Sequence, residues 1–324
     1  MPNTRNWEAR IGRRVRLRDL HVLFAVVHHG SMSKAGAELG MSQSAVSQAI
    51  ATLEHAVQVL LLDRTPRGVE ITPYGAALMR RGQAAFDELR SGVREIECLA
   101  DPELGDVRIA CAEAIAAGIL PRVIERFCAR FPKVKLQVLQ TSTPVTGFSE
   151  LQQRKADLVL TLLPNRVDAQ LGEDLHRDTW FYDRICLAAA RDSAWGRRRK
   201  IRMADLAHAS LLCPPADTPG GAAIGDAIRS AGLQESPVKI TTLSVHLRTA
   251  LSARGPFIAV LPASILRFNS AFHSLKELPV ELPFPQLPAL IVTLKNRTLN
   301  PPVERFIACA REFAKDAWVE NSKR

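Results

Sequence analysis

Short polar side chains, and not a catalytic set, dominate one face of a helix that the sequence predicts after Ser42. In chain order that face carries Gln43, Ser44, Ser47, Gln48 and Ala51. A helix that enters the major groove of DNA needs short side chains for close approach, and its amides and hydroxyls pair with base edges. A helix that merely faces solvent more commonly carries Lys and Glu. The pattern therefore favours DNA reading, with Gln48 as the main base reader.

Three short helices are expected to position this face. Apolar residues at helical spacing precede Gly30, a second helix ends at Gly40, and the third helix follows the cap residue Ser42. The buried stripe of the third helix repeats at intervals of four, three and four residues and consists of Val46, Ile50, Leu53 and Val57. Two short helices joined at Gly40-Met41 predict a helix-turn-helix.

Serine and arginine residues around this unit offer further DNA contacts. Ser31 and Ser42 either only cap their helices or also contact phosphates at the helix N-termini. A strand, a turn and a second strand over 60–71 predict a wing, with Arg64 and Arg67 on the DNA backbone or in the minor groove. For Arg64, a structural ion pair is the alternative.

A long helix is expected from Thr72-Pro73, where a cap residue precedes a proline in the first turn, to about Ala100. Its apolar residues alternate by three and four, which is typical of a coiled-coil seam: Phe86, Leu89, Val93, Ile96 and Ala100. A helix packed on its own domain would show the same stripe. We favour dimerisation, because no other apolar segment nearby in the sequence could cover it.

Beyond a linker at 101–105 the pattern changes to alternating strands and helices. A strand–helix–strand–helix–strand order predicts a parallel sheet with helices on its faces, over 107–111, 119–131, 134–138, 149–154 and 158–160. A second set follows over 185–189, 211–213, 221–231, 238–242, 246–253 and 257–261. A further strand at 289–294 and a helix from Pro301 to about Ala317 complete the module.

The composition fits two or three folded domains and an anionic partner. The 324 residues are 47% hydrophobic and 23% charged, with a formal net charge of +10 and a pI near 9.7. Nucleic acid and a membrane surface fit that charge equally well. The basic run Arg197–Lys200 is interpreted as a solvated loop and not as a second nucleic-acid site.

The cysteines and the start of the chain indicate a cytoplasmic protein. Six cysteines are scattered without a CxxC pair, which is typical of small core residues in a reducing compartment. A redox pair of Cys186 with Cys213 and metal ligation are the alternatives. No signal-peptide core follows the arginine-rich stretch 1–18, and no stretch is apolar enough to span a bilayer.

The polar face and the wing closely resemble the DNA-binding part of the LysR family of transcriptional regulators. The resemblance runs through Gly30-Ser31, Ser42–Gln48, Leu53-Glu54, Asp63–Gly68 and Ile71–Gly75. It continues more weakly, as a likeness to the family's regulatory domain, through Leu120-Pro121, Phe127, Phe131-Pro132, Asp157-Leu158 and Gly255–Pro262. The departures from the family pattern are Gly36 for an alanine, Gln58 and Arg154 for glycines, Leu62 for a phenylalanine, and Phe257 for a glycine.

The resemblance implies a multidomain α/β architecture. A basic N-terminal extension at 1–16 would precede a winged helix-turn-helix DNA-binding domain at 17–75 and a linker and dimerisation helix at 73–100. The effector-binding regulatory domain, at 104–320, would have a two-lobed periplasmic-binding-protein-like (type 2) fold. Lobe I would comprise about 104–178 and 276–320, and lobe II about 179–275.

The resemblance also implies partners. It implies a bacterial homodimer, usually paired again as a homotetramer, bound to double-stranded promoter DNA and able to contact RNA polymerase. Two-fold symmetric readers require an inverted-repeat site. Whether such a regulator activates or represses stays open.

A cleft between the two implied lobes would hold a small-molecule effector. Ligands of such folds sit at strand carboxyl ends, which here places Glu113, Ala114, Thr141, Ser142, Thr143, Thr161 and the loop 214–220 around the cleft. The hydroxyl run Thr141–Thr143 suits a carboxylate or another small anion, and plain helix capping is the alternative. We expect an unidentified small-molecule co-inducer and no cofactor or metal.

Three other functions fit the sequence less well. An extracytoplasmic solute-binding protein would share the α/β module but not the DNA-reading helix. An enzyme would need a nucleophile elbow, a P-loop, a GxGxxG sequence or a metal-ligand cluster, and the sequence contains none. A DNA-architectural protein that senses nothing would leave the α/β module without a purpose.

Overall fold

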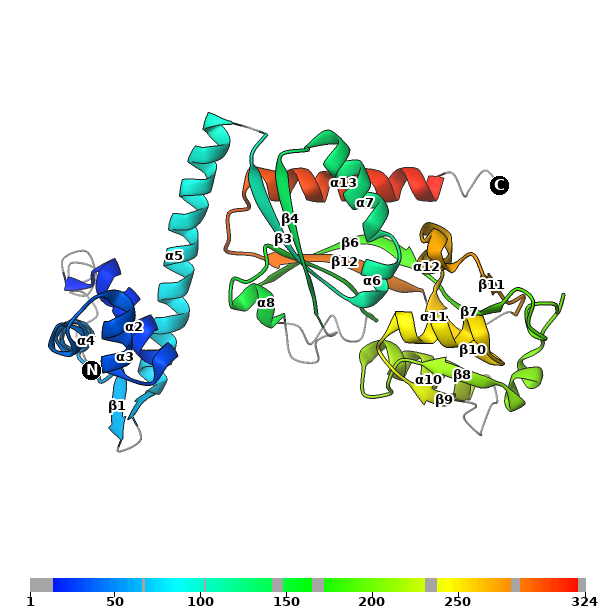
Figure 1. The fold of residues 1–324 in the computed structure, drawn as a ribbon, viewed down its shortest axis with the longest axis horizontal. Coiled ribbons are helices and arrows are strands. Elements are labelled where there is room, and N and C mark those ends of the chain that lie inside the picture. Colours follow the sequence, from blue (N-terminus) through cyan, green and yellow to red (C-terminus); the bar gives the residue numbers. More distant parts are fainter. Residues whose placement is uncertain are drawn as a thin grey trace. The chain divides into compact units, whose positions relative to one another are not determined.

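The structure, a computed structural model, describes residues 14–65, 68–101, 103–141, 148–164, 172–230, 238–280 and 286–319. The chain divides into two units, Met1–Arg90 and Ser91–Arg324 (Figure 1). Within the described ranges no helix has both the length and the apolar character that a membrane crossing requires.

The first unit is a three-helix core with a two-stranded wing. Its elements are α2 (Leu17–His29), α3 (Met32–Leu39), α4 (Gln43–Val57), β1 (Leu62–Thr65), β2 (Gly68–Ile71) and the start of α5 (Pro73–Ala100). Fully buried Leu23 of α2, Ala35 of α3 and Leu53 of α4 belong to one cluster that joins the three helices. Gly30 and Gly40 end α2 and α3 in the left-handed conformation, at φ 60° and 62°, because only glycine adopts it without strain. The predicted helix ends are confirmed.

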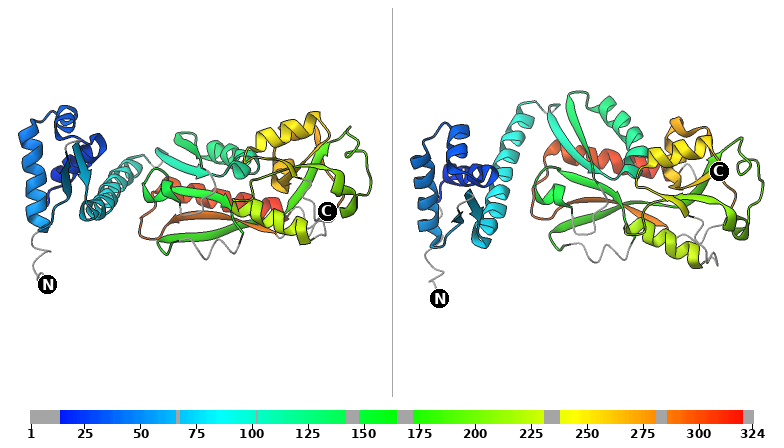
Figure 2. Two further views of the ribbon diagram at one scale, coloured as in Figure 1. Left: turned by 90° about the horizontal axis from the view of Figure 1, so that it is seen from below. Right: turned by 60° about the horizontal axis from the view of Figure 1, so that its bottom comes forward.

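The second unit contains two five-stranded sheets, visible as separate lobes in two further views of the ribbon (Figure 2). Lobe I has the strand order β4-β3-β5-β12-β6. Its elements are β3 (Gly105–Cys111), α6 (Glu113–Ala117), α7 (Leu120–Arg130), β4 (Val134–Gln140), α8 (Ser149–Gln152), β5 (Leu158–Leu162), β6 (Leu175–Asp183), β12 (Leu287–Leu294) and α13 (Pro301–Val319). Alternate strand residues face opposite ways, so Ile109 packs towards α7 and α13, while Ala110 packs towards α8.

Lobe II has the strand order β11-β7-β10-β8-β9. Its elements are β7 (Ile185–Ala190), η2 (Met203–His208), β8 (Ser210–Cys213), α10 (Pro219–Ser230), β9 (Val238–Thr241), α11 (Val245–Arg254), β10 (Phe257–Pro262), α12 (Ala263–Phe268), η3 (Ser270–Phe272) and β11 (Leu275–Glu277). Residues of α11 and α12 pack on Ala188 and Ala259, and Ile224 of α10 belongs to the cluster that contains Leu187 and Val260.

The predicted parallel pairing of the first three strands of lobe I is confirmed, but each sheet as a whole is mixed and not parallel. In lobe I, β3 pairs in parallel with β4 and β5, but β12 runs antiparallel to β5 and β6. In lobe II, β10 is parallel to β8 and antiparallel to β7. The reason is that the chain crosses between lobes twice, so that β6 leaves lobe I and β12 returns to it in the opposite direction.

The lobe boundaries also differ from the predicted ones. β6 extends to Asp183 within the sheet of lobe I, and β11 at Leu275–Glu277 belongs to the sheet of lobe II. The predicted boundary after 178 therefore falls inside β6. That strand is absent from the sequence prediction because its polar and apolar residues, Leu-His-Arg-Asp-Thr-Trp-Phe-Tyr-Asp, do not alternate regularly.

Candidate DNA interface and ligand pocket

The polar face predicted for DNA lies on the outside of α4. Gln43, Ser44 and Gln48 are exposed and Ser47 is half-buried, whereas Val46 on the opposite face is fully buried. The helix begins directly after Ser42, whose hydroxyl accepts a hydrogen bond from the Ala45 N–H at 3.2 Å. The helix therefore presents amides and hydroxyls without a charged side chain along its first two turns.

Ser31 and Ser42 both act as helix caps. The Ser31 hydroxyl accepts a hydrogen bond from the Lys34 N–H at 3.4 Å at the start of α3. The Ser42 hydroxyl also lies 2.9 Å from that of Ser44. Capping does not exclude a phosphate contact, because the N-terminal N–H groups of a helix attract anions.

The wing is held against the helices by backbone and carboxylate contacts. The Val69 N–H donates to the Gly30 carbonyl at 3.0 Å. Glu54, near the end of α4, accepts hydrogen bonds from the N–H groups of Leu61 and Leu62 at 2.9 and 3.3 Å. Arg64 lies on β1 opposite Val69, but its side chain and all of Arg67 lie outside the described residues. Glu54 thus positions the wing, a role that the sequence prediction missed.

The apolar stripe of α5 divides into two parts. Phe86 packs edge-on against Phe24 of the first unit, with ring centroids 5.5 Å apart. Leu89, Val93 and Ile96 are 51%, 56% and 67% exposed, and no described residue covers them. Phe86 therefore belongs to the core of the first unit and not to the exposed seam, because Phe24 of α2 already contacts its ring.

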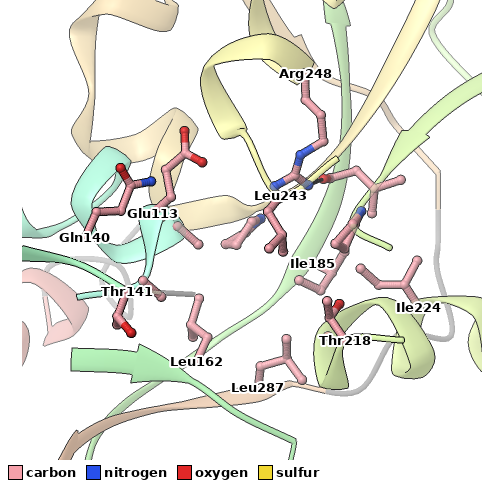
Figure 3. A pocket seen from close by; sticks show the side chains of 16 residues that line it. Glu113, Gln140, Thr141, Leu162, Ile185, Thr218, Ile224, Leu243, Arg248 and Leu287 are labelled. Carbon is pink, nitrogen blue, oxygen red and sulfur yellow. Dashed lines mark hydrogen bonds between the residues drawn. The ribbon is translucent and has the colours of Figure 1, made fainter. Parts of the chain in front are cut away.

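A pocket of about 330 Å³ lies between the two lobes of the second unit, as the close-up shows (Figure 3). The sequence placed several of its residues correctly around a common cleft: Glu113, Ala114, Thr141, Pro214, Thr218 and Gly220. Ser142 and Thr143 lie outside the described residues. The other lining residues are Ala112, Gln140, Leu162, Ile185, Ile224, Leu243, Arg248, Val260, Pro262 and Leu287.

Thr161 and Thr141 differ from their predicted roles. Thr161 is buried within β5 and does not line the pocket, because alternate residues of a strand face opposite ways and the next residue, Leu162, lines it instead. Thr141 does line the pocket, but its hydroxyl donates to Oε1 of Glu150 at 2.5 Å. Its proton is therefore already engaged by a carboxylate, which weakens the case for Thr141 as an anion donor.

Arg248 is the one cationic lining residue of the pocket among the described residues. It lies on the buried face of α11 with Val245, Thr249 and Ser252, and Figure 3 shows its guanidinium pointing from α11 into the pocket. Burial lowers the pKa of Arg248 to about 10 against the opposing effect of the nearby Cys213 and Glu113. The group still carries its charge at neutral pH. The sequence signal that could have revealed it is an arginine at i+3 and i−4 from buried residues of one helix.

A second buried arginine belongs to an ion-pair network in lobe I. Arg108 and Arg297 both donate to Asp157 Oδ1 at 2.7 Å. Burial raises the pKa of Asp157, but the hydrogen bond from Arg108 and the charges of Arg297 and Arg108 outweigh it and leave that pKa lowered. The network joins β3, the residue before β5 and the segment that follows β12, so its role is structural.

The cysteine geometry favours the core interpretation. Cys186 and Cys213 are buried and free, and burial raises the pKa of Cys213 to about 12 and that of Cys186 further. Their strands β7 and β8 flank β10, which separates them by about 9–10 Å. A disulfide needs Cα atoms within about 7 Å, so these two thiols cannot pair without rearrangement of the sheet.

Two family models match the chain. Residues 17–76 match the bacterial regulatory helix-turn-helix protein, lysR family, and residues 100–315 match the LysR substrate binding domain. The uncharacterized HTH-type transcriptional regulator YfeR of Shigella flexneri is 28% identical over 295 residues, which covers 91% of this chain and 87% of the relative. The HTH-type transcriptional regulator GbpR of Azospirillum brasilense is 25% identical over 299 residues, covering 92% and 86%.

Solved structures share the fold at low sequence identity. Full-length CbnR in complex with its target DNA has a TM-score of 0.63 at 18% identity and covers 92% of this chain and 99% of its own. A full-length OxyR variant from Pseudomonas aeruginosa has a TM-score of 0.62 at 19% identity, covering 92% and 95%. The order of a helix-turn-helix, a long helix and a two-lobed α/β module is thus common to all three chains.

Proposed function

The chain belongs to the LysR family of bacterial transcriptional regulators, and we propose that α4 reads its operator in the major groove with Gln48 as the main base reader. The protein is a DNA-binding regulator with an effector-binding domain, and not an enzyme. The observation that carries the proposal is the polar face of α4, whose amides and hydroxyls lie opposite the buried residues Val46, Ile50 and Leu53. The structural relative CbnR is known in complex with its target DNA.

Further contacts follow from the helix ends and the wing. The capped N-termini of α3 and α4, at Ser31 and Ser42, offer N–H groups to phosphates. Gln43, Ser44 and Ser47 read or approach base edges beside Gln48. Arg64 and Arg67 contact the backbone or the minor groove from the wing.

The exposed seam of α5 supports dimerisation. Three exposed apolar residues recur on this helix at intervals of four and three residues: Leu89, Val93 and Ile96. A second copy of α5 would cover them, and the resulting two-fold symmetry requires an inverted-repeat operator. In the full assembly two dimers pair as a tetramer on promoter DNA, in the bacterial cytoplasm at the nucleoid, where RNA polymerase is within reach.

The pocket between the lobes is proposed to bind a small-molecule co-inducer. Both lobes supply its walls, and the chain passes between them after Asp183 and again between β11 and β12. A ligand that contacts both lobes changes their relative orientation, and it shifts the regulator towards the conformation that it binds better.

Fluorescence anisotropy on operator DNA tests the reader. The operator is first selected from genomic fragments that include the DNA upstream of the regulator's own gene, and a scrambled duplex serves for comparison. The double variant Ser47→Ala/Gln48→Ala should lose sequence preference, since each good base contact contributes about 1–3 kcal/mol, while its salt dependence persists.

A control variant that removes positive charge away from the reading helix separates base reading from general electrostatic attraction. Replacement of the exposed run Arg197–Lys200 by serine should leave the affinity and its salt slope unchanged. If this control lost as much affinity as the double variant, or if the double variant kept its sequence preference, the proposed reading helix would be wrong.

A further inference from the structure

Among the described residues Arg248 has no ion-pair partner, whereas a buried guanidinium normally has one. The residue is 4% exposed, its Nη1 donates to the Val260 carbonyl at 2.5 Å, and its buried Nε has no hydrogen-bond partner among the described residues. No carboxylate in the described ranges forms an ion pair with it; the nearby Glu113 instead accepts a hydrogen bond from the His246 N–H at 3.2 Å. A buried charge without an ion-pair partner costs stability. The presence of Arg248 at this position therefore needs an explanation other than stabilisation of the fold.

The chain provides an internal comparison in Arg297. That residue is also buried, at 7% exposed, and its guanidinium donates to the Asp157 carboxylate at 2.7 Å. It lines no part of the interlobe pocket, whereas Arg248 does. Arg297, which has a structural role, is thus paired, whereas the Nε–H of the pocket residue Arg248 has no acceptor in the part of the chain that the structure describes.

The other lining residues of the pocket indicate which kind of ligand could pair with Arg248. Leu162, Ile185 and Leu287 face the guanidinium across the cavity (Figure 3), and Ile224 and Leu243 extend this apolar lining. Glu113 is the other charged lining residue among those described, and its carboxylate forms no ion pair with Arg248 there but repels a second negative charge on a ligand. This repulsion disfavours a dianion such as phosphate.

We propose that the effector is a small organic monoanion, a carboxylate with an apolar body, whose charged group binds Arg248 while its body packs on the leucine and isoleucine side chains. This inference rests on the proposed effector function of the pocket. A carboxylate accepts two parallel N–H bonds from a guanidinium, and it would engage the unpaired Nε. A cavity of about 330 Å³ holds one molecule of this kind.

The test uses pairs of probes that differ only in charge. Full-length protein is titrated by calorimetry and thermal shift with benzoate, phenylacetate, hexanoate and octanoate, and with the primary amide of each. At least one carboxylate should bind, and its amide should bind about tenfold more weakly or worse, because a charge-assisted hydrogen bond is replaced by a neutral one. Binding of the amides as tightly as the acids, or no binding of any carboxylate, would overturn the proposal.

Arg248→Met keeps an unbranched side chain as long as the aliphatic part of arginine and removes the charged guanidinium. It should abolish the preference for the acid over the amide, and in the absence of ligand its melting temperature should equal or exceed that of the wild type, because a buried unpaired charge has been removed. Arg254→Met, at the exposed end of the same helix, is the matched control and should bind the carboxylate as the wild type does. Wild-type carboxylate affinity in Arg248→Met would contradict the inference.

Operator binding, measured on the same samples, separates this inference from the function on which it rests. If the wild type binds its operator selectively but no carboxylate, the anion assignment fails and the regulator remains. If the wild type binds no DNA selectively, the proposed function itself fails. Arg248→Lys provides a third variant, and it should retain the preference for acids over amides with lower affinity because ammonium lacks the bidentate fork.

Discussion

At the scale of single residues, two non-glycine positions among the described residues adopt a left-handed backbone. Gln58 ends α4 at φ 61°, and Arg154 stands at φ 58° before Asp157. These are two of the positions at which the sequence departs from a glycine of the family. A side chain with a Cβ pays about 1 kcal/mol or more in this conformation, so both departures are expected to cost stability.

Gln58→Gly should therefore raise the free energy of unfolding by about 1 kcal/mol. Part of the gain is offset, because the Gln58 side chain donates to the His55 carbonyl at 2.6 Å. Urea denaturation followed by circular dichroism measures the change. Gln58→Ala is the control, since alanine loses that hydrogen bond and keeps the strain; a gain in Gln58→Ala equal to that in Gln58→Gly would refute the backbone explanation.

Two of the buried aspartates, Asp157 and Asp183, should respond to pH in opposite ways. The lowered pKa of Asp157 means that its stabilising contribution is fully present above the unfolded value of about 3.9 and is lost as the pH falls through the folded value. Asp157→Asn should cost about 3–5 kcal/mol at neutral pH, because the buried Arg297 loses its counter-charge. Denaturation midpoints across the acid range, with and without the substitution, measure both effects.

Asp183, at the end of β6, should show a pH dependence opposite to that of Asp157. Burial raises its pKa against the hydrogen bonds from Ser264 and the N–H of Arg184, and its Oδ2 is buried without a partner among the described residues. Its ionisation opposes folding as the pH rises above the unfolded value. Asp183→Asn should therefore be neutral or stabilising at pH 7 and should lose that advantage in acid; a large loss at pH 7 would show that the carboxylate is needed.

At the scale of elements, the exposed seam of α5 leads to a prediction about assembly. Leu89→Glu and Val93→Glu place like charges on facing helices and should shift the dimer to monomer without lowering the melting temperature of the first unit, because both side chains are exposed. Phe86→Ala should instead lower that melting temperature by removing the contact with Phe24. Sedimentation and calorimetry distinguish the two classes. Dimers that persist in Leu89→Glu/Val93→Glu would place the interface elsewhere.

Elements with a local cause were predictable, and those set by tertiary contacts were not. The ends of α2 and α3 follow from Gly30 and Gly40, and the long helix from Thr72, whose hydroxyl accepts a hydrogen bond from the Gly75 N–H at 3.0 Å. β6 has no regular alternation because the sheet of lobe I covers it unevenly. Arg248 could not be predicted, because its importance comes from the lack of an acceptor for its Nε–H among the described residues. Only the folded structure reveals this.

The candidate sites follow the same division. The DNA-reading face lies on one helix, so the helical spacing of its residues could be recognised in the sequence. The pocket gathers strand ends and loops of two lobes, and there the rule about carboxyl ends located Glu113, Ala114 and Thr141 but chose the wrong face of β5 at Thr161. A one-residue error on a strand moves a side chain to the opposite face.

At the scale of the whole molecule, effector and DNA binding must be coupled if the protein regulates transcription in response to a ligand. Coupling is reciprocal, so a carboxylate that changes operator affinity by a given factor must have its own affinity changed by the same factor when operator is bound. We expect that factor to be about 5–150-fold. Calorimetric titration of the carboxylate into free protein and into the protein–operator complex measures how the operator changes the affinity for the carboxylate. Anisotropy with and without ligand measures how the carboxylate changes the affinity for the operator. Arg248→Met should retain operator binding that no longer responds to the carboxylate. Equal ligand affinities in the free and DNA-bound protein would mean that the pocket does not control DNA binding, even if Arg248 binds the anion.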